Sequence, residues 1–217
     1  MQRITAWIFV NGDLPSPQRL TPLIGRQDLL IAADGGLRHL QALGLQPKVL
    51  IGDLDSVSPD QIAAVRQQGV EILRYPVEKN ETDLELAIQH AIDQGANSIR
   101  IAAALGDRLD HTLGNLFLLL RPEFEKMDLR LDDGRQEVFL IRSQTLIDGA
   151  PGDLVSLLPY GRPALGVQTE RLYYPLQSET LYPDHTRGIS NVMQAGTAAV
   201  SLADGLLICV HIRQPGV

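Results

Sequence analysis

Two aspartates, Asp53 and Asp55, directly follow a short apolar segment, "KVLI" (48–51). Such a segment is typical of a buried strand, and the paired carboxylates at its end are candidates for chemistry. At about 4 Å, two like charges repel by roughly 1 kcal/mol in water and by about 4 kcal/mol at an effective dielectric of about 20. An exposed turn carries such a pair without difficulty, so the pair indicates a site only if other acids gather at the same place.

Further charged residues do follow strand-like segments in the same way. They are Asp34 after residues 28–33, Lys79 and Asp83 after residues 70–75, and Asp107, Arg108, Asp110 and His111 after residues 98–105. The carboxyl ends of parallel strands meet at one edge of a sheet, and open α/β sheets bind ligands at that edge. We therefore expect these side chains to lie close together.

Carboxylates on short loops are suited to a hard divalent cation. Mg²⁺ typically takes one or two carboxylates together with waters and substrate phosphates. Asp34 is followed by Gly35 and Gly36, which let the backbone approach a ligand closely. A simple helix-capping role explains Asp83 or Asp110 equally well when each is taken alone. Four acidic loops at one edge are better explained by a metal-bridged phosphate site.

The usual phosphate-binding and nucleophile motifs do not occur in the sequence. It has no G-x-x-x-x-G-K-[ST], no G-x-G-x-x-G and no G-x-S-x-G. His111 is a candidate base, and a role in holding a loop or a phosphate is an equal alternative. Arg108 suits phosphate oxygens, with a structural pairing to Asp107 or Asp110 as the alternative.

The first 120 residues alternate between strand-like and helix-like patterns. The expected strands are 4–10, 28–33, 48–51, 70–75 and 98–105, and the expected helices are 35–44, 58–69, 81–96 and 109–120. Strands that alternate with helices predict a mostly parallel sheet covered by helices, an α/β unit.

Capping signals mark where two of these helices begin. Thr82 with Glu85, and Ser58 with Gln61, have the spacing of a capping box. The helix after Thr82 carries its apolar residues on one face, at Leu84, Ala87, Ile88, Ala91 and Ile92.

The pattern changes after about residue 122. Residues 129–141 predict two strands around a turn at Asp133-Gly134, and the remainder shows short strands separated by Gly and Pro. "ADGL" (203–206) is expected to be a hairpin turn. These features predict a small all-β sandwich. We expect an α/β domain over residues 1–144 and a β-sandwich domain over residues 145–217.

Composition excludes several classes of protein. The formal charge of −7 disfavours non-specific binding to nucleic acid or to an anionic membrane. The single cysteine, Cys209, makes no internal disulfide and belongs to no cysteine-rich metal motif. The first residues read as a strand and not as a signal peptide, and no apolar stretch reaches membrane-spanning length. A cytoplasmic location is expected.

Taken in order, four motifs make the sequence recognisable. "DGG" (34–36), "GDLDS" (52–56), "KNETDLELA" (79–87) and "LGDRLDHTLGNL" (105–116) resemble those of the thiamine pyrophosphokinase family. The second half agrees with that family's thiamine-binding β domain at "LVSLLPYG" (154–161), "YYPL" (173–176) and "GISN" (188–191). The resemblance covers nearly the whole chain.

The resemblance implies an enzyme that transfers a diphosphoryl group from ATP to the hydroxyethyl oxygen of thiamine and releases AMP. It also implies a homodimer, with each active site shared between the α/β domain of one subunit and the β domain of the other. Asp53, Asp55 and Asp83 would hold Mg²⁺, or Mn²⁺, against the ATP phosphates. Asp34, Gly35, Gly36, Lys79 and Asn115 would bind ATP. Arg108, Asp110 and His111 would line the phosphate and hydroxyl region, and Ser190 and Asn191 would contact thiamine.

The sequence departs from the family in two places. It also does not identify the general base that would receive the proton of the thiamine hydroxyl. Some members carry a tryptophan between the serine and asparagine that correspond to Ser190 and Asn191, and here that tryptophan is absent. The one tryptophan, Trp7, is expected in the core. Asp107 stands where many relatives have glycine. Both Asp110 and Asp83 are candidates for receiving the hydroxyl proton.

Three other functions are alternatives to this one. A related diphosphokinase would act on another alcohol, such as a pterin. An aspartate-dependent phosphatase would use "DLDSV" (53–57) with Asp53 as nucleophile, but would place that motif on the first strand. A non-catalytic nucleotide or thiamine sensor would bind without releasing AMP.

Overall fold

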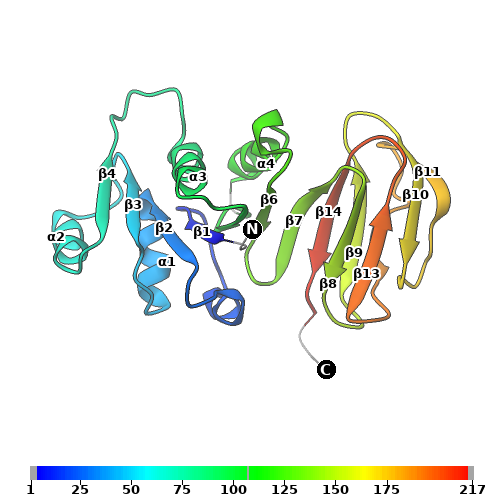
Figure 1. Cartoon of the computed structure of the whole chain (residues 1–217), viewed down its shortest axis with the longest axis horizontal. Helices are drawn as coiled ribbons and strands as arrows, with labels where there is room; N and C mark the ends of the chain where they lie inside the picture. Colours follow the sequence, from blue (N-terminus) through cyan, green and yellow to red (C-terminus); the bar gives the residue numbers. More distant parts are fainter. Residues whose placement is uncertain (1–3, 107, 215–217) are drawn as a thin grey trace. The chain divides into compact units, whose positions relative to one another are not determined.

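The structure is a computed structural model that describes residues 4–106 and 108–214 (Figure 1). Its contacts divide the chain into two compact units, one ending at Gly134 and the other beginning at Arg135. The expected boundary at residue 144 lies further along the chain. The reason for the difference is strand β7 (Gln136–Ile141), which pairs antiparallel with β14 (Leu207–Ile212) and so belongs to the second unit.

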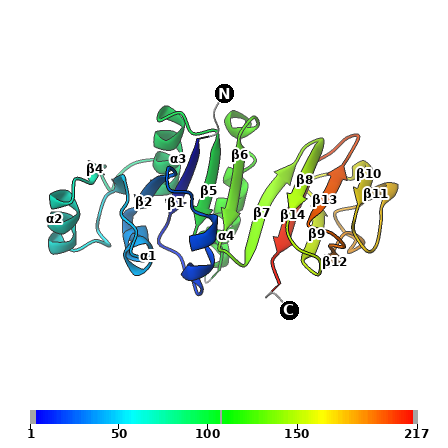
Figure 2. The ribbon, with the colours of Figure 1, turned by 60° about the horizontal axis from the view of Figure 1, so that its bottom comes forward.

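The first unit is built on six parallel strands. They are β1 (Thr5–Phe9), β2 (Leu29–Ala33), β3 (Val49–Gly52), β4 (Glu71–Arg74), β5 (Ser98–Ala102) and β6 (Asp128–Asp132). The strand order is β6-β5-β1-β2-β3-β4, and Figure 2 shows the inner strands side by side. The chain builds outward from β1 to β4 and then returns past β1 to β5. The switch point of the sheet therefore lies at β1.

Helices and short 3-10 turns connect these strands. The helices are α1 (Leu37–Ala42), α2 (Pro59–Gln67), α3 (Asp83–Asp93) and α4 (Leu109–Leu118). The 3-10 turns are η1 (Pro17–Arg19), η2 (Thr21–Leu23), η3 (Asp34–Gly36) and η4 (Pro122–Phe124). Every strand and helix expected in this half of the sequence is present, with ends that differ by a few residues.

The two faces of the sheet are covered by different helices. Trp7 and Phe9 of β1 belong to a buried cluster that also contains Leu37 and Leu40 of α1. The intervening Ile8 is also fully buried, and successive residues of a strand point to opposite faces. The connection from β4 to β5 runs back across the sheet, so a right-handed crossover places α3 on the face opposite α1 (Figure 1). Trp7 is therefore a core residue, as expected.

Both predicted capping boxes are present. The Ser58 hydroxyl accepts a hydrogen bond from the Gln61 N–H at 3.2 Å, and the Gln61 side chain accepts one from the Ser58 N–H at 3.1 Å. Thr82 and Glu85 make the same reciprocal pair at 3.2 and 2.8 Å. These bonds satisfy N–H groups that have no partner within the helix, and they fix the residue at which each helix begins.

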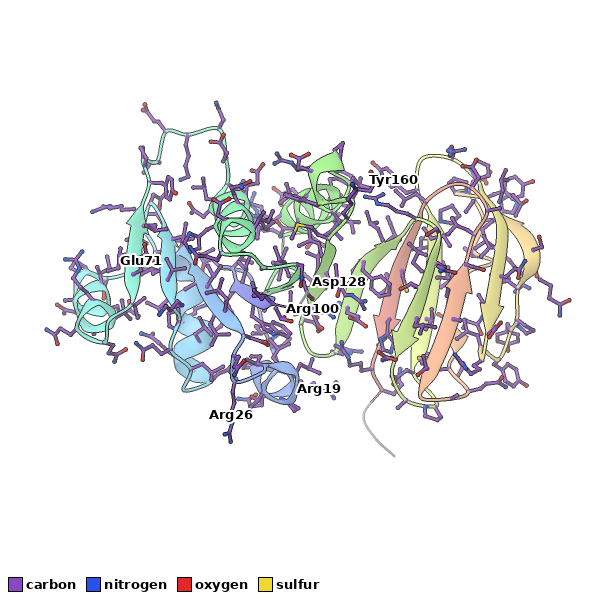
Figure 3. The ribbon with its side chains drawn as sticks, viewed as in Figure 1. Arg19, Arg26, Glu71, Arg100, Asp128 and Tyr160 are labelled. Carbon is purple, nitrogen blue, oxygen red and sulfur yellow. The ribbon has the colours of Figure 1, made fainter. Side chains whose placement is uncertain are left out.

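An ion pair joins two neighbouring strands of the same sheet. Arg100 on β5 lies 3.5 Å from Asp128 at the start of β6, and both residues are labelled in Figure 3. Asp128 also accepts a hydrogen bond from Arg130 at 2.7 Å. All three side chains are partly buried, so the two arginines balance the negative charge of the Asp128 carboxylate.

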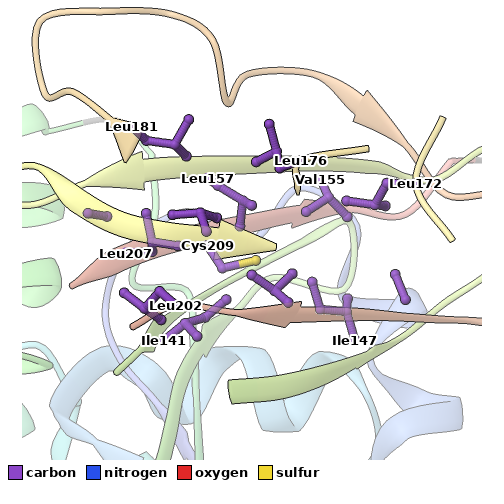
Figure 4. Close-up of a cluster of buried hydrophobic side chains, with 14 of the residues drawn as sticks. Ile141, Ile147, Val155, Leu157, Leu172, Leu176, Leu181, Leu202, Leu207 and Cys209 are labelled. Atoms are coloured by element: carbon purple, nitrogen blue, oxygen red, sulfur yellow. The ribbon is translucent and has the colours of Figure 1, made fainter. Parts of the chain in front are cut away.

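The second unit is an antiparallel β sandwich. One sheet has the order β12-β9-β14-β7 and the other β11-β10-β13-β8. The remaining strands are β8 (Gln144–Asp148), β9 (Leu154–Pro159), β10 (Ala164–Glu170), β11 (Gln177–Leu181), β12 (Asn191–Val192) and β13 (Thr197–Ser201). Buried side chains from both sheets form its core (Figure 4), among them Ile141, Val155, Leu207 and Cys209 from the first sheet and Ile147 and Leu181 from the second.

One predicted turn is wrong. "ADGL" joins β13 to β14, but these strands lie in different sheets: β13 pairs with β8 and β10, and β14 pairs with β7 and β9. Gly205 takes a φ of 107°, and Asp204 forms an isolated bridge with Leu165. The segment is therefore a connection between sheets. A short Asp-Gly sequence does not distinguish the two cases, because both need a residue with positive φ.

No helix in the described part of the chain is long and apolar enough to span a bilayer.

Candidate functional site

Three carboxylates converge at the carboxyl edge of the parallel sheet. Asp34 follows β2, Asp53 follows β3, and Asp83 is the first residue of α3. One carboxylate oxygen from each lies within 4.8 Å of the others. Three strand-to-helix connections that are far apart in sequence thus bring their acids to one point, as the sequence predicts for this edge.

A glycine makes this convergence sterically possible. A Cβ added to Gly52 would lie 3.1 Å from Cγ of Asp83 and 3.2 Å from Cβ of Asp34. Gly52 also has a φ of 146°, which side chains rarely adopt. The last residue of β3 is therefore glycine because two of the carboxylates occupy the space beside it.

The loop after β3 separates Asp53 from Asp55. Leu54 between them has a φ of 65° and a buried side chain. Asp53 contributes to the carboxylate cluster, whereas Asp55 is exposed and accepts a hydrogen bond from the Ser56 hydroxyl at 2.9 Å. The family resemblance implies Asp55 among the metal ligands and Asp34 among the ATP-binding residues. In this geometry Asp34 takes the third place in the cluster.

Lys79 is the cation nearest to Asp83. Its ammonium lies 3.1 Å from Oδ1 of Asp83 and donates to the carbonyl of Pro76 at 3.0 Å. Burial raises the pKa of the Asp83 carboxyl, Lys79 opposes that rise, and the charges of Asp53 and Asp34 add to it. The cluster is thus short of positive charge, with one lysine beside three carboxylates.

The site fits a divalent cation on its own geometry. Oδ1 of Asp83 is buried and, among the described residues, has no hydrogen-bond partner of suitable geometry, although Lys79 lies within ion-pair distance. Three carboxylates within reach of one point form the all-oxygen donor set that Mg²⁺ or Mn²⁺ prefers. Asp34, Asp53 and Asp83 are therefore the candidate metal ligands.

A cleft of about 390 Å³ opens beside the cluster. Its walls come from the segments after β1, β2 and β5, which surround the switch point of the sheet, and from the start of α3. Of the residues singled out from the sequence, Asp34, Asp83, Arg108, His111 and Asn115 line it. The cleft thus joins the acidic cluster to the basic start of α4.

The start of α4 supplies the basic wall of this cleft. Arg108 and His111 line it, whereas Asp110 is exposed and pairs with Arg108 at 3.2 and 2.5 Å. The hydrogen bond from Arg108 lowers the pKa of the Asp110 carboxyl. Asp107, the departure noted in the sequence, lies outside the described residues.

Several of the expected ATP-binding residues have structural partners here. Asn115 donates to the carbonyl of Ala104 at 3.0 Å and so holds the loop after β5. A Cβ on Gly36 would lie 1.9 Å from the carbonyl oxygen of Phe9, and one on Gly35 would lie 2.2 Å from the side chain of Asn11. The close approach that these glycines permit is to the end of β1.

Sequence reasoning missed two residues of the cleft. Asn11, after β1, accepts a hydrogen bond from Arg38 and donates to Ser56 at 3.4 Å. Thr112 exchanges hydrogen bonds with the backbone of Gly106 at 3.1 and 3.2 Å. The signal for Asn11 was available, since it follows the first strand at the same edge as the acids. Thr112 carried none, because its role depends on the path of the preceding loop.

The two expected thiamine contacts lie in the second unit. Ser190 is exposed with a φ of 59°, and its N–H donates to the Ser156 hydroxyl at 3.0 Å. Asn191 is buried, and its side chain hydrogen-bonds the backbone of Tyr174. The structure thus places Ser190 at the surface and gives Asn191 partners within its own unit.

A parallel sheet with a carboxylate cluster and a cleft at its switch point defines an α/β protein with a candidate metal-assisted ligand site. The chain belongs to the thiamin pyrophosphokinase family. The family's sequence profile for "Thiamin pyrophosphokinase, catalytic domain" matches residues 20–131, and the profile for "Thiamin pyrophosphokinase, vitamin B1 binding domain" matches residues 143–207. The first span contains the whole carboxylate cluster.

Individual relatives agree over nearly the whole chain. A thiamine pyrophosphokinase of Bacillus subtilis is 27% identical over 216 residues, covering 93% of this chain and 97% of the relative. Thiamine pyrophosphokinase 1 of Arabidopsis thaliana is 26% identical, covering 97% of this chain and 87% of the relative. The crystal structure of the thiamine pyrophosphokinase from Bacillus subtilis superposes with a TM-score of 0.85 at 23% identity, covering 97% of this chain and all of that one. The predicted fold, an α/β unit followed by a β sandwich, is confirmed.

Proposed function

We propose that this protein transfers a diphosphoryl group from ATP to the hydroxyl of thiamine, giving thiamine diphosphate and AMP. The observation that carries the proposal is the convergence of Asp34, Asp53 and Asp83 beside the cleft, in a chain of this family. Transfer between phosphate and alcohol oxygens needs positioning and charge neutralisation more than covalent help. A site rich in carboxylates provides both once a metal–nucleotide complex is bound.

Asp34, Asp53 and Asp83 would hold the Mg²⁺, with Mn²⁺ as an alternative. When bound, such a cation neutralises the phosphate charge that builds up during transfer. Lys79 lies next to Asp83, where its ammonium can turn from the carboxylate to a phosphate oxygen. Arg108 and His111 approach the same cleft from α4, and a guanidinium matches the geometry of phosphate oxygens.

Neither candidate base is held as an unpaired carboxylate. Asp83 lies in the cluster beside Lys79, and Asp110 forms an exposed ion pair with Arg108. A loose transition state makes little demand on a base, because the attacking oxygen keeps its proton until late. We therefore propose that positioning carries the reaction and that the hydroxyl proton passes to water instead of to either aspartate.

The direct test is incubation of the purified protein with ATP, Mg²⁺ and thiamine, followed by chromatography of the products. Equal amounts of thiamine diphosphate and AMP are expected. Asp53→Asn should lower the rate by about 10²-fold or more, since it removes a ligand of the cation. Asp60→Asn, an exposed aspartate in the first turn of α2, is the matched control and should keep the wild-type rate.

Other products would identify the alternatives. ADP or free phosphate would indicate a kinase or an aspartate-dependent phosphatase. AMP formed with a pterin alcohol but not with thiamine would indicate the related diphosphokinase. Binding of ATP without AMP release would indicate a sensor, and any of these outcomes would overturn the proposal. The cytoplasmic location expected from the sequence remains a prediction.

We also propose that the protein acts as a homodimer with shared active sites. Supporting this, α4 carries an apolar stripe that is unusually exposed: Leu109 is 70% exposed, Leu113 is 40% exposed, and Phe117 continues the same i, i+4 row. None of the residues of α4 is buried. The same helix lines the cleft, so a partner covering the stripe would lie beside the site.

Mixing of variants tests the shared site. Asp53→Asn disables the α/β unit, and Ser190→Trp blocks the exposed serine proposed to meet thiamine in the β unit. If each site combines units from two subunits, an exchanged equal mixture should recover about a quarter of wild-type activity, since half the dimers are mixed and each has one intact site. A mixture that stays as inactive as its components, although native mass spectrometry shows mixed dimers, would place each site within one chain.

A further inference from the structure

Arg38, the second residue of α1, holds the loop that leaves β1 at the switch point of the sheet. Its guanidinium donates to the carbonyl oxygens of Asn11 and Gly12 at 2.8 and 2.9 Å, and also to the side-chain oxygen of Asn11. Nε2 of His39 lies 2.9 Å from the same carbonyl of Gly12. Two neighbouring residues of α1 thus fix the loop in which Asn11 lies.

The same arginine decides which way the side-chain amide of Asn11 faces. A guanidinium has only donors, so the Asn11 atom that faces Arg38 must be the oxygen, Oδ1. The amide nitrogen, Nδ2, therefore faces the other way, toward the hydroxyl of Ser56 at 3.4 Å. Within the described part of the chain this long contact is the one acceptor of Nδ2, although the nitrogen carries two hydrogens. Asn11 thus has donor capacity that the fold leaves largely unused.

This donor lies beside the carboxylate cluster. The backbone N–H of Ser56 donates to Oδ1 of Asp34 at 3.4 Å, so Ser56 contacts both Asn11 and a candidate metal ligand. A Cβ on Gly35 would lie 2.2 Å from Oδ1 and 2.9 Å from Nδ2 of Asn11, so the amide occupies the space that this glycine leaves open. Asn11 and Asp34 both line the cleft. The amide is therefore placed where an anion bridged to the cluster by a divalent cation would arrive.

We propose that Nδ2 of Asn11 donates to a phosphate oxygen of the bound nucleotide, and that Arg38 is the positioning residue that turns the amide for this purpose. The inference rests on the nucleotide site of the proposed function and names a further recognition element of it. Hydrogen bonds to ionised oxygens are among the stronger ones. A cationic side chain here would pair with the carboxylates, as Lys79 does with Asp83, whereas a neutral amide leaves them to the metal.

Calorimetric titration of the whole protein with the magnesium complex of a non-hydrolysable ATP analogue tests the inference. Asn11→Asp keeps an oxygen for Arg38 but replaces the donor by a negative charge, so Kd should rise by about tenfold or more. Asn11→Ala removes the donor without adding charge, and Kd should rise several-fold. Thermal unfolding of both variants should stay close to that of the wild type, because the Asn11 side chain is exposed.

Asn97→Asp is the matched control. Asn97 is also exposed, and its Oδ1 likewise accepts a hydrogen bond, from the N–H of Ile4 at 3.1 Å. It directly precedes β5, however, and so lies at the opposite edge of the sheet from the cleft. Its Kd for the analogue should equal that of the wild type.

Arg38→Met tests the positioning role. The variant frees the Asn11 amide to turn, so KM for ATP should rise several-fold while KM for thiamine stays within about twofold. Arg38→Lys, which still offers a donor to Oδ1, should recover most of the affinity. Arg38→Met combined with Asn11→Ala should bind the analogue no more weakly than Asn11→Ala alone, because the arginine acts through the amide. Fully additive losses would overturn the positioning role. Arg66→Met, at an exposed position on α2, should bind as the wild type does.

Product analysis and titration together separate this inference from the proposed function. A wild-type protein that makes thiamine diphosphate, with an Asn11→Asp variant of unchanged Kd and KM for the nucleotide, would overturn the inference and leave the proposed function standing. A wild-type protein that binds the analogue but makes no thiamine diphosphate, with Asn11 variants that bind more weakly, would overturn the proposed function and support the inference. A wild-type protein that neither binds the analogue nor releases AMP from ATP would overturn both.

Discussion

The ammonium of Lys79 lies 3.1 Å from Oδ1 of Asp83, in the loop just before α3 and one helical turn away in sequence. Asp83 is one of three carboxylates that share a point at the sheet edge. Lys79 therefore supplies positive charge where a divalent cation is proposed to bind. Lys79 would thus compete with a cation for this carboxylate oxygen.

Removing Lys79 should make the fold more dependent on metal. Lys79→Met leaves three carboxylates without their lysine, so the metal-free protein should lose about 1–2 kcal/mol of unfolding free energy. Added Mg²⁺ should stabilise this variant more than it stabilises the wild type, which thermal unfolding with and without Mg²⁺ measures. Lys126→Met, which replaces an exposed lysine elsewhere, should show the wild-type response. An unchanged response in the Lys79 variant would mean that the lysine does not compete with the cation.

Gly52→Ala should weaken metal binding by shifting two ligands. The new Cβ would lie 3.1 Å from Cγ of Asp83 and 3.2 Å from Cβ of Asp34. Backbone strain at positive φ should also cost about 1 kcal/mol or more of stability. Mn²⁺ binding followed by electron paramagnetic resonance, together with urea unfolding, measures both effects.

Gly69→Ala separates strain from displacement. Gly69 has a φ of 82°, and an added Cβ would meet nothing within 4 Å. This variant should lose similar stability yet bind Mn²⁺ as the wild type does. If both variants bound Mn²⁺ normally, Gly52 would have no role in shaping the cluster.

His39 should make stability fall in mild acid. Its Nε2 lies 2.9 Å from the carbonyl oxygen of Gly12, and burial lowers the pKa of its imidazole below the model-peptide value of 6.5. A lowered folded-state pKa means that stability is complete above about pH 6.5 and is lost as the pH falls below that value toward the folded pKa. Urea unfolding between pH 7.5 and 5 should show this loss, and His39→Gln should flatten it.

His211 should be essential to the stability of the β sandwich. Its ring is fully buried, with Nδ1 3.0 Å from Glu137 and Nε2 3.0 Å from Asp153. Burial alone would raise the pKa of Asp153, but the N–H groups of Gln214 and Ala150 and the ring of His211 outweigh it and lower that pKa. Each ring nitrogen thus lies within hydrogen-bond distance of a carboxyl oxygen contributed by a segment distant in the chain.

Replacing this histidine leaves two buried carboxylates without a shared donor. His211→Leu should therefore destabilise the unit by about 3–5 kcal/mol, measured by urea unfolding. His185→Leu, at an exposed position in the same unit, should change stability by less than about 0.5 kcal/mol. A loss below about 1 kcal/mol in the His211 variant would mean that the two carboxyl groups do not depend on this ring for stability.

Local sequence determined the elements and where they begin. The capping boxes at Ser58 and Thr82 connect residues three apart, so their geometry depends on one helical turn alone. The apolar face of α3 was predictable for the same reason, and its Leu84, Ala87, Ile88 and Ala91 are buried. The position of the acids after strands was likewise enough to predict a common edge, because parallel strands carry their ends to one side.

Tertiary structure decided which of those acids meet. Asp53 and Asp55 look equivalent in sequence, but the left-handed turn at Leu54 sends only Asp53 to the cluster, and Asp34 from another loop completes it. The role of Asn191 was likewise not determined by the sequence, because an amide can bind a ligand or hold a backbone segment. The path of residues 171–176 brings the backbone of Tyr174 within hydrogen-bond distance of this amide. Such choices depend on contacts between segments distant in the chain, which local spacing does not encode. The types of residue at the site and their chemistry could therefore be predicted from the sequence. Which residues they contact was determined by the tertiary packing.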